Sequence, residues 1–170
     1  MIIYFIFSHD SIQKAVKQET SLLAERKTID TQNGERSFFE ELVMDEEYDI
    51  LFRRLFLEAH AEIMKIIPPK FLNSTPTDLS STFTEFQDFR QDRDFALWLN
   101  TKCDFTEQYK KSIGIKIQQF LVDYICWRWL ETKSPQDAVT YYSRLNKNLL
   151  LIKELLLRII HPLRKKPSFP

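Results

Sequence analysis

The sequence predicts a mainly α-helical bundle with a long C-terminal antiparallel helical hairpin and a short N-terminal strand. Three observations lead to this prediction. The chain of 170 residues has only two glycines, Gly34 and Gly114, which disfavours folds built from many tight turns. Apolar residues recur at helical spacing in three long stretches of the chain. A single β-branched and aromatic run, Ile2 to Phe7, is typical of a buried strand.

Length and composition indicate a single helical domain over 1–170. A chain of this length can bury enough apolar surface to fold without disulfides or a structural metal. Lysine plus arginine equals aspartate plus glutamate at 24 each, so no net charge attracts the whole chain to nucleic acid or an anionic membrane. Cys103 and Cys126 lie far apart, with no second pair to complete a zinc site, and we expect both to be reduced, buried thiols.

The apolar run at 1–7 is expected to be a strand or a docking segment. It is much shorter than the roughly 20 residues that span a bilayer, and it lacks the basic flank of a signal peptide. We therefore expect no membrane association and a cytoplasmic location. A strand needs a partner, either within the chain or in a neighbouring subunit's sheet, and both alternatives stay open. Ile3, Phe5 and Phe7 are accordingly candidate interface residues.

A first helix is expected to start at a cap on Ser8 or Asp10 and to continue to about Lys27. A polar loop around Asn33-Gly34 should follow it, because this dipeptide is typical of turns. The inward-facing positions of the first helix are expected to be Ile12, Ala15, Val16, Glu19, Leu22 and Leu23.

A second helix is expected over 45–67, with acidic residues at its positive end and a stop at Pro68 and Pro69. The region 83–100 fits both a strand pattern and a helical pattern. Its conformation is left undecided.

The C-terminal hairpin is expected to begin with a helix over 106–131. Ser134-Pro135-Gln136-Asp137 then combines a capping serine, a proline at the first helical position and an acid in the first turn, which together mark a new helix. The short turn should pack the two helices antiparallel. The apolar seam of the last helix, with alternating spacings of four and three, is Ala138, Tyr142, Leu145, Leu149, Ile152, Leu156 and Ile159.

Leu151 and Leu155 widen the apolar surface of the last helix beyond one seam. An isolated helical hairpin cannot cover this surface, so a third helix or another subunit should do so. We therefore interpret both leucines as candidate interface residues.

The densest aromatic and cationic cluster lies around one helical turn of the hairpin. It comprises Tyr124, Trp127, Arg128 and Trp129, near Tyr141, Tyr142 and Arg144. Tryptophan, tyrosine and arginine dominate binding hot spots, which favours a protein interface. The same residues could instead close the core of the bundle, with Arg128 stacked on an indole ring. Both interpretations stay open.

The segment 162–170 is a basic tail containing Arg164, Lys165 and Lys166. Chain ends commonly fray, so simple disorder is one interpretation. The other is a clamp on an acidic neighbouring protein. Nucleic acid is expected as a partner only through this tail.

No catalytic residue, metal or cofactor is predicted. The chain contains no P-loop, no Gly-x-Gly-x-x-Gly, no His-Glu-x-x-His and no Gly-x-Ser-x-Gly motif. Glu58 and Glu62 lie one helical turn apart, but His60 falls on a different face and no second copy of such a motif exists. A solvated helix face is the favoured interpretation of these three residues, and an unrecognised metalloenzyme is the alternative.

Four segments, which form a minor part of the chain, carry a resemblance to a known family: Asp49 to Ala59 before a proline break, Tyr124 to Leu130, Pro135 to Ala138, and Tyr141 to Leu145. They resemble segments of bacteriophage neck proteins, the head-to-tail adaptors that lie under the portal. The resemblance implies a helical-bundle subunit that forms a homo-oligomeric ring in the virion, assembled in the host cytoplasm. Its chain ends would reach neighbours such as a portal or tail protein. The N-terminal strand departs from the family's pattern.

The sequence therefore favours a structural, non-enzymatic subunit of a large assembly, most specifically a phage head-to-tail connector that oligomerises through helix faces and chain ends. The alternative is a small helical adaptor or regulatory module that binds a protein partner through the groove beside Leu151 and Leu155.

Overall fold

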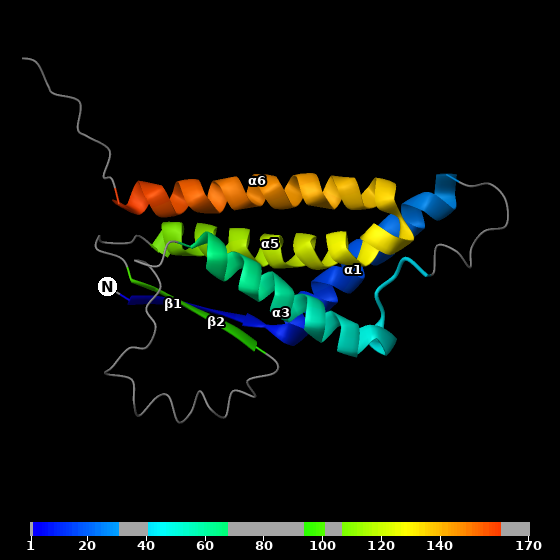
Figure 1. The fold of residues 1–170 in the computed structure, drawn as a ribbon, viewed down its shortest axis with the longest axis horizontal. Helices are drawn as coiled ribbons and strands as arrows, with labels where there is room; N and C mark the ends of the chain where they lie inside the picture. The colour runs from blue at the N-terminus through cyan, green and yellow to red at the C-terminus, as the bar shows by residue number, and fades with distance from the viewer. Residues whose placement is uncertain (1, 31–40, 68–93, 101–106, 161–170) are drawn as a thin grey trace, which may run out of the picture.

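A computed structural model of the chain describes residues 2–30, 41–67, 94–100 and 107–160 (Figure 1). It confirms the predicted helical bundle with an N-terminal strand and a C-terminal antiparallel hairpin. The elements in chain order are β1 (Ile2–Ser8), α1 (His9–Asp30), the short 3-10 helix η1 (Glu46–Tyr48), α3 (Asp49–Ile66), β2 (Asp94–Asn100), α5 (Glu107–Lys133) and α6 (Pro135–Ile160).

Helix α5 lies at the centre of the bundle. Helix α6 packs along one side of α5, while α1, α3 and β1 contact α5 from its other sides (Figure 1). Because neighbours surround it, α5 is buried almost all round over 120–126, as a central helix should be. Its buried residues are Ile113, Ile117, Phe120, Leu121, Val122, Asp123, Tyr124, Ile125, Cys126, Trp129 and Leu130.

The hairpin turns at Ser134, as its sequence predicts. The backbone N–H of Ser134 donates to the carbonyl of Leu130 at 2.7 Å, and the Ser134 hydroxyl hydrogen-bonds the carboxylate of Asp137 in the first turn of α6. Lys27 of α1 lies 2.6 Å from the same Asp137 carboxylate. The turn that joins α5 to α6 is therefore also tied to α1.

The partner of the N-terminal strand lies within the chain. β1 and β2 pair antiparallel from Ile2 opposite Asn100 to Ser8 opposite Asp94. Phe7 stacks on Phe95 with ring centroids 5.5 Å apart, and both rings are buried. The undecided region 83–100 thus contains a strand in its last seven residues, and the rest of that region lies outside the described residues.

Several detailed expectations need correction. The buried positions of α1 include Thr20 and Ala24, whereas Leu22, expected to face inward, is 42% exposed. In α6, four residues of the expected seam are buried, namely Ala138, Leu145, Ile152 and Leu156. Tyr141 and Asn148 are also buried, whereas their seam neighbours Tyr142 and Leu149 are exposed and half-buried, respectively.

Other expectations fall outside the described residues. They concern the Asn33-Gly34 turn, Cys103 and the 162–170 tail with Arg164, Lys165 and Lys166. In the described part of the chain, no helix combines the length and hydropathy needed to cross a bilayer.

Candidate functional site: hollows on two sides of the hairpin

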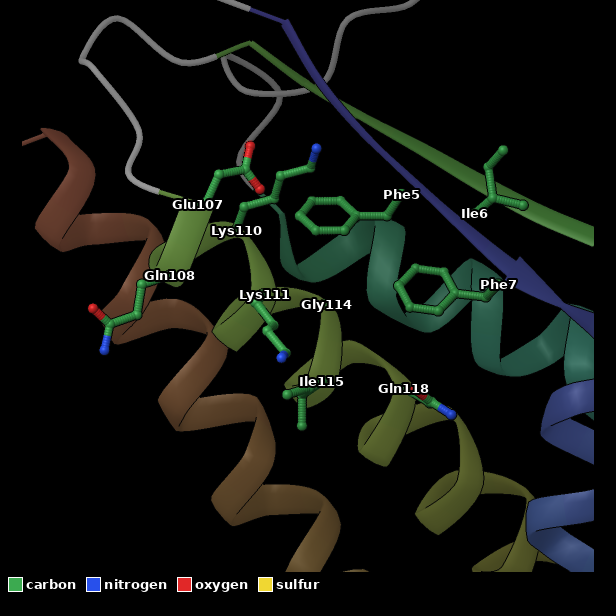
Figure 2. A pocket seen from close by; sticks show the side chains of 10 residues that line it. All are labelled: Phe5, Ile6, Phe7, Glu107, Gln108, Lys110, Lys111, Gly114, Ile115 and Gln118. Atoms are coloured by element: carbon green, nitrogen blue, oxygen red, sulfur yellow. The ribbon is translucent and has the colours of Figure 1, made fainter.

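A groove runs between β1 and α5, and we call it the β1–α5 groove. Its volume is about 640 Å³. Figure 2 shows the rings of Phe5 and Phe7 pointing from β1 toward α5, with Lys110 and Lys111 projecting from α5. Gly114 faces Phe5 directly, because a Cβ placed on this glycine would lie 3.2 Å from the Phe5 ring. The groove therefore has an aromatic wall on β1 and a wall with two lysines on α5.

A second hollow of about 360 Å³ lies between α1 and α5, and we call it the α1–α5 hollow. Ile115 and Gln118 line both this hollow and the β1–α5 groove, so the two are adjacent. Three apolar side chains along this face are exposed by 40–45%, which is unusual for large aliphatic residues placed close together. They are Ile6, Leu22 and Ile115.

The α1–α5 hollow ends at a polar cluster that joins three helices. Arg144 of α6 lies 3.1 Å from Glu19 of α1 and 3.0 Å from Asp123 of α5. Asn148 donates to the second oxygen of Asp123 at 2.8 Å, and the Tyr141 hydroxyl lies 3.4 Å from Glu19. The cluster therefore ties α1, α5 and α6 together beneath the hollow.

Burial raises the pKa of Asp123 to about 6, although the Arg144 guanidinium and the Asn148 hydrogen bond act in the opposite direction. Its side chain is only 1% exposed, so desolvation of the carboxylate outweighs both favourable contacts. The carboxyl group lines the hollow but is held by contacts to α6. Its arrangement suits a structural tie between helices.

A third hollow lies on α5 and α6, and we call it the aromatic hollow. Its volume is about 310 Å³. The rings of Trp127 and Tyr142 lie 5.0 Å apart, and Val139 beside them is 67% exposed. The Arg128 guanidinium lies 5.6 Å from the Trp127 ring and also pairs with Glu131 at 2.6 Å. Partly exposed tryptophan, tyrosine and arginine side chains are typical of protein interfaces.

The aromatic hollow and the α1–α5 hollow lie on different sides of the hairpin. Tyr142 and Arg144 are two residues apart in α6, so their directions differ by about 200° around the helix. Arg144 pairs with α1, whereas Arg128, next to the aromatic hollow, lies 3.7 Å from Glu58 of α3. One side thus adjoins α1 and the other adjoins α3.

The predicted interface residues divide between core and surface. Trp129 is buried, and its Nε1 donates to the Leu42 carbonyl at 2.7 Å. Tyr141 is buried as well, while Trp127 and Arg128 are half-buried. The structure therefore places one tryptophan in the core and the other at the aromatic hollow.

The remaining predicted interface residues differ in how far they are buried. Phe7 is buried and Phe5 half-buried, and Ile3 lies opposite Leu99 in the sheet. Leu151 and Leu155 are half-buried. Sequence reasoning missed Ile115, Leu22 and Val139 as exposed apolar residues, because a helical pattern alone does not show which apolar positions lack a neighbour.

Glu58, His60 and Glu62 do not converge. Glu58 pairs with Arg54 at 3.1 Å and Glu62 with Lys65 at 2.6 Å. The His60 ring packs 3.9 Å from the Phe95 ring, and burial lowers its pKa. Across the described ranges, no three His, Cys, Asp or Glu side chains come close enough to hold a metal ion.

No protein-family model, curated protein or solved structure matches this chain. The surface features described above are therefore the main indication of its function.

Proposed function

We propose that this chain is a structural, non-enzymatic subunit of a large assembly, most specifically a head-to-tail connector of a bacteriophage virion. It would bind copies of itself in a ring and contact a portal or tail protein. The observation that supports this proposal is the presence of two unlike apolar surfaces on different sides of one helical hairpin.

A ring requires two such surfaces. In a closed ring each subunit contacts its neighbours head to tail, so one surface meets a different surface of the next copy. A two-fold dimer would instead use one surface twice. The α1–α5 hollow offers exposed aliphatic residues, Leu22 and Ile115, and the aromatic hollow offers Trp127, Tyr142 and Val139. This pairing of an aliphatic surface with an aromatic one fits the head-to-tail case.

The specific identification as a connector is supported by the sequence resemblance to phage neck proteins. The resembling segments include Tyr124 to Leu130 and Tyr141 to Leu145, which contain Trp127 and Tyr142 of the aromatic hollow. In this proposal the virion is where the protein acts, and the host cytoplasm is where it assembles.

Self-assembly is tested by light scattering over a concentration series. We expect the wild-type chain to form one discrete oligomer larger than a dimer. Tyr142→Asp should reduce it to monomers without changing the far-ultraviolet circular dichroism, since a charge placed among apolar contacts is costly. Thr140→Asp is the matched control, because Thr140 is an exposed α6 residue that does not line the aromatic hollow. A wild-type chain that is monomeric at every concentration contradicts the proposal.

A second candidate is an adaptor module that binds a helix of another protein along α6. One observation favours it: Leu150 is 66% exposed, beside the half-buried Leu151. Leu150→Glu should then abolish partner binding and leave the stability unchanged. A monomeric wild-type chain whose soluble partner is lost with Leu150→Glu would favour this candidate over the ring.

A further inference from the structure

One edge of β1 is unpaired within the described residues. β2 pairs with β1 at all seven positions, from Ile2 to Ser8, and these two strands form the whole described sheet. Figure 2 shows β2 on one side of β1 and the β1–α5 groove with α5 on the other. The unpaired edge of β1 therefore borders the groove.

β1 lacks the features that normally protect a strand edge. Exposed edges usually carry a charged residue, a proline or a bulge, which prevents another strand from adding. The sequence of β1, Ile-Ile-Tyr-Phe-Ile-Phe-Ser, contains none of these residue types, and its register with β2 runs without interruption. An edge of this kind offers unused backbone N–H and C=O groups to an incoming strand.

The groove can receive the side chains of such a strand. An added strand would present every second side chain to the same face of the sheet as Phe5 and Phe7, whose rings stack 6.2 Å apart. On that face, α5 contributes the exposed Ile115. The volume of the groove, about 640 Å³, leaves room for several apolar side chains.

The charges on the groove wall indicate the chemistry of the occupant. Lys110 and Lys111 line the groove with a single acidic residue, Glu107. Lys111 is exposed and forms no salt bridge in the part of the chain that the structure describes. An extended segment with a carboxylate near Lys111 therefore complements this wall better than a basic segment does.

We infer that β1 accepts an extended segment of a partner polypeptide as a third strand, with apolar side chains at alternate positions over the groove and an acidic residue near Lys111. The inference rests on the proposed function, because it assigns one contact of the assembly subunit to a segment of a neighbouring protein.

Two synthetic peptides test strand addition to the full-length protein. The first alternates valine and threonine with an aspartate at each end, and the second has lysines in place of the aspartates. We expect fluorescence anisotropy to show the acidic peptide binding about fivefold more tightly. An excess of the acidic peptide should also slow the hydrogen exchange of the backbone amides of β1. A version of the acidic peptide with methylated backbone nitrogens should not bind, because it cannot pair with the edge.

Matched variants separate the groove from the rest of the surface. Lys111→Glu should reverse the preference between the two peptides, whereas Lys147→Glu, the same change at an exposed α6 site, should not. Ile115→Ser should weaken binding about fivefold, and Ile50→Ser at the 86% exposed Ile50 of α3 should leave it unchanged. No binding of either peptide, or equal binding of the methylated peptide, would overturn the inference.

The outcome is independent of ring formation. Peptide binding by a chain that remains monomeric would support strand addition and contradict the ring. A ring-forming chain that binds neither peptide would support the ring and contradict strand addition.

Discussion

The side-chain nitrogen of Asn148 in α6 donates a hydrogen bond to Oδ2 of Asp123 in α5, at 2.8 Å. Both residues are buried between the two helices. The other carboxylate oxygen, Oδ1, lies 3.0 Å from Arg144, but its geometry makes no hydrogen bond among the described residues. Asp123 is thus a buried acid with one good hydrogen bond and one ion pair.

This arrangement predicts a pH-dependent stability. Burial raises the pKa of Asp123 from 3.8 to about 6, so the folded state binds its proton more tightly than the unfolded state. The contribution of this group to stability is therefore greatest below about pH 4 and declines as the pH rises to about 6. Relative to Asp123→Asn, the wild type should lose about 2 kcal/mol of unfolding free energy between pH 4 and pH 7.

Urea denaturation of both proteins at several pH values measures this difference. All other carboxylates are present in both proteins and contribute equally to the pH dependence of their stability. The difference between the two profiles therefore reports on Asp123 alone. Parallel stability profiles for wild type and Asp123→Asn would show that the pKa of Asp123 is not raised by folding.

The two tryptophans of α5 should respond differently to the same substitution. Trp129→Phe removes the donor to the Leu42 carbonyl and leaves that carbonyl without its 2.7 Å hydrogen bond. We expect a loss of about 2–3 kcal/mol of unfolding free energy. Trp127→Phe, at the half-buried residue beside the aromatic hollow, should cost less than about 1 kcal/mol. Equal losses in urea denaturation would contradict this division between core and surface.

Gly114→Ala should change stability little, although Gly to Ala inside a helix ordinarily stabilises by about 1 kcal/mol. The added methyl would lie 3.2 Å from the Phe5 ring, and this close contact opposes the gain in helix propensity. In a Phe5→Leu background the ring is absent, so Gly114→Ala should stabilise by about 1 kcal/mol. A double-mutant cycle by urea denaturation checks this, and equal effects in both backgrounds would exclude a tight contact.

The hairpin was predictable because its signals are local. Ser134 and Pro135 mark the turn, and the helical spacing of apolar residues on both sides needs no distant information. The sequence did not determine which residues of α6 face the core, because apolar side chains occupy adjacent positions along this helix. Tyr141 is buried and Tyr142 exposed, which local pattern alone does not distinguish.

Other features depend on residues far away in the chain. Asn148 is buried in place of Leu149 because Asp123, on the facing helix, supplies its hydrogen-bond partner. β2 was ambiguous because its partner strand lies near the other end of the chain. Leu22 and Ile115 are exposed because no described element packs over them. The local sequence pattern does not show whether a neighbouring element will cover an apolar residue.

The pairing of β1 with β2 also has a consequence for synthesis. Ser8 lies opposite Asp94, so 86 residues (94 − 8) separate the closest pair of the sheet. At roughly 5–20 residues per second, a ribosome needs about 4–17 s to make that stretch. For this interval the nascent chain carries Ile2 to Phe7 without the strand that pairs with it, while α1 and then α3 are being made. Unpaired apolar segments of this kind promote aggregation, so we expect co-expression with a chaperone to raise the yield of folded protein.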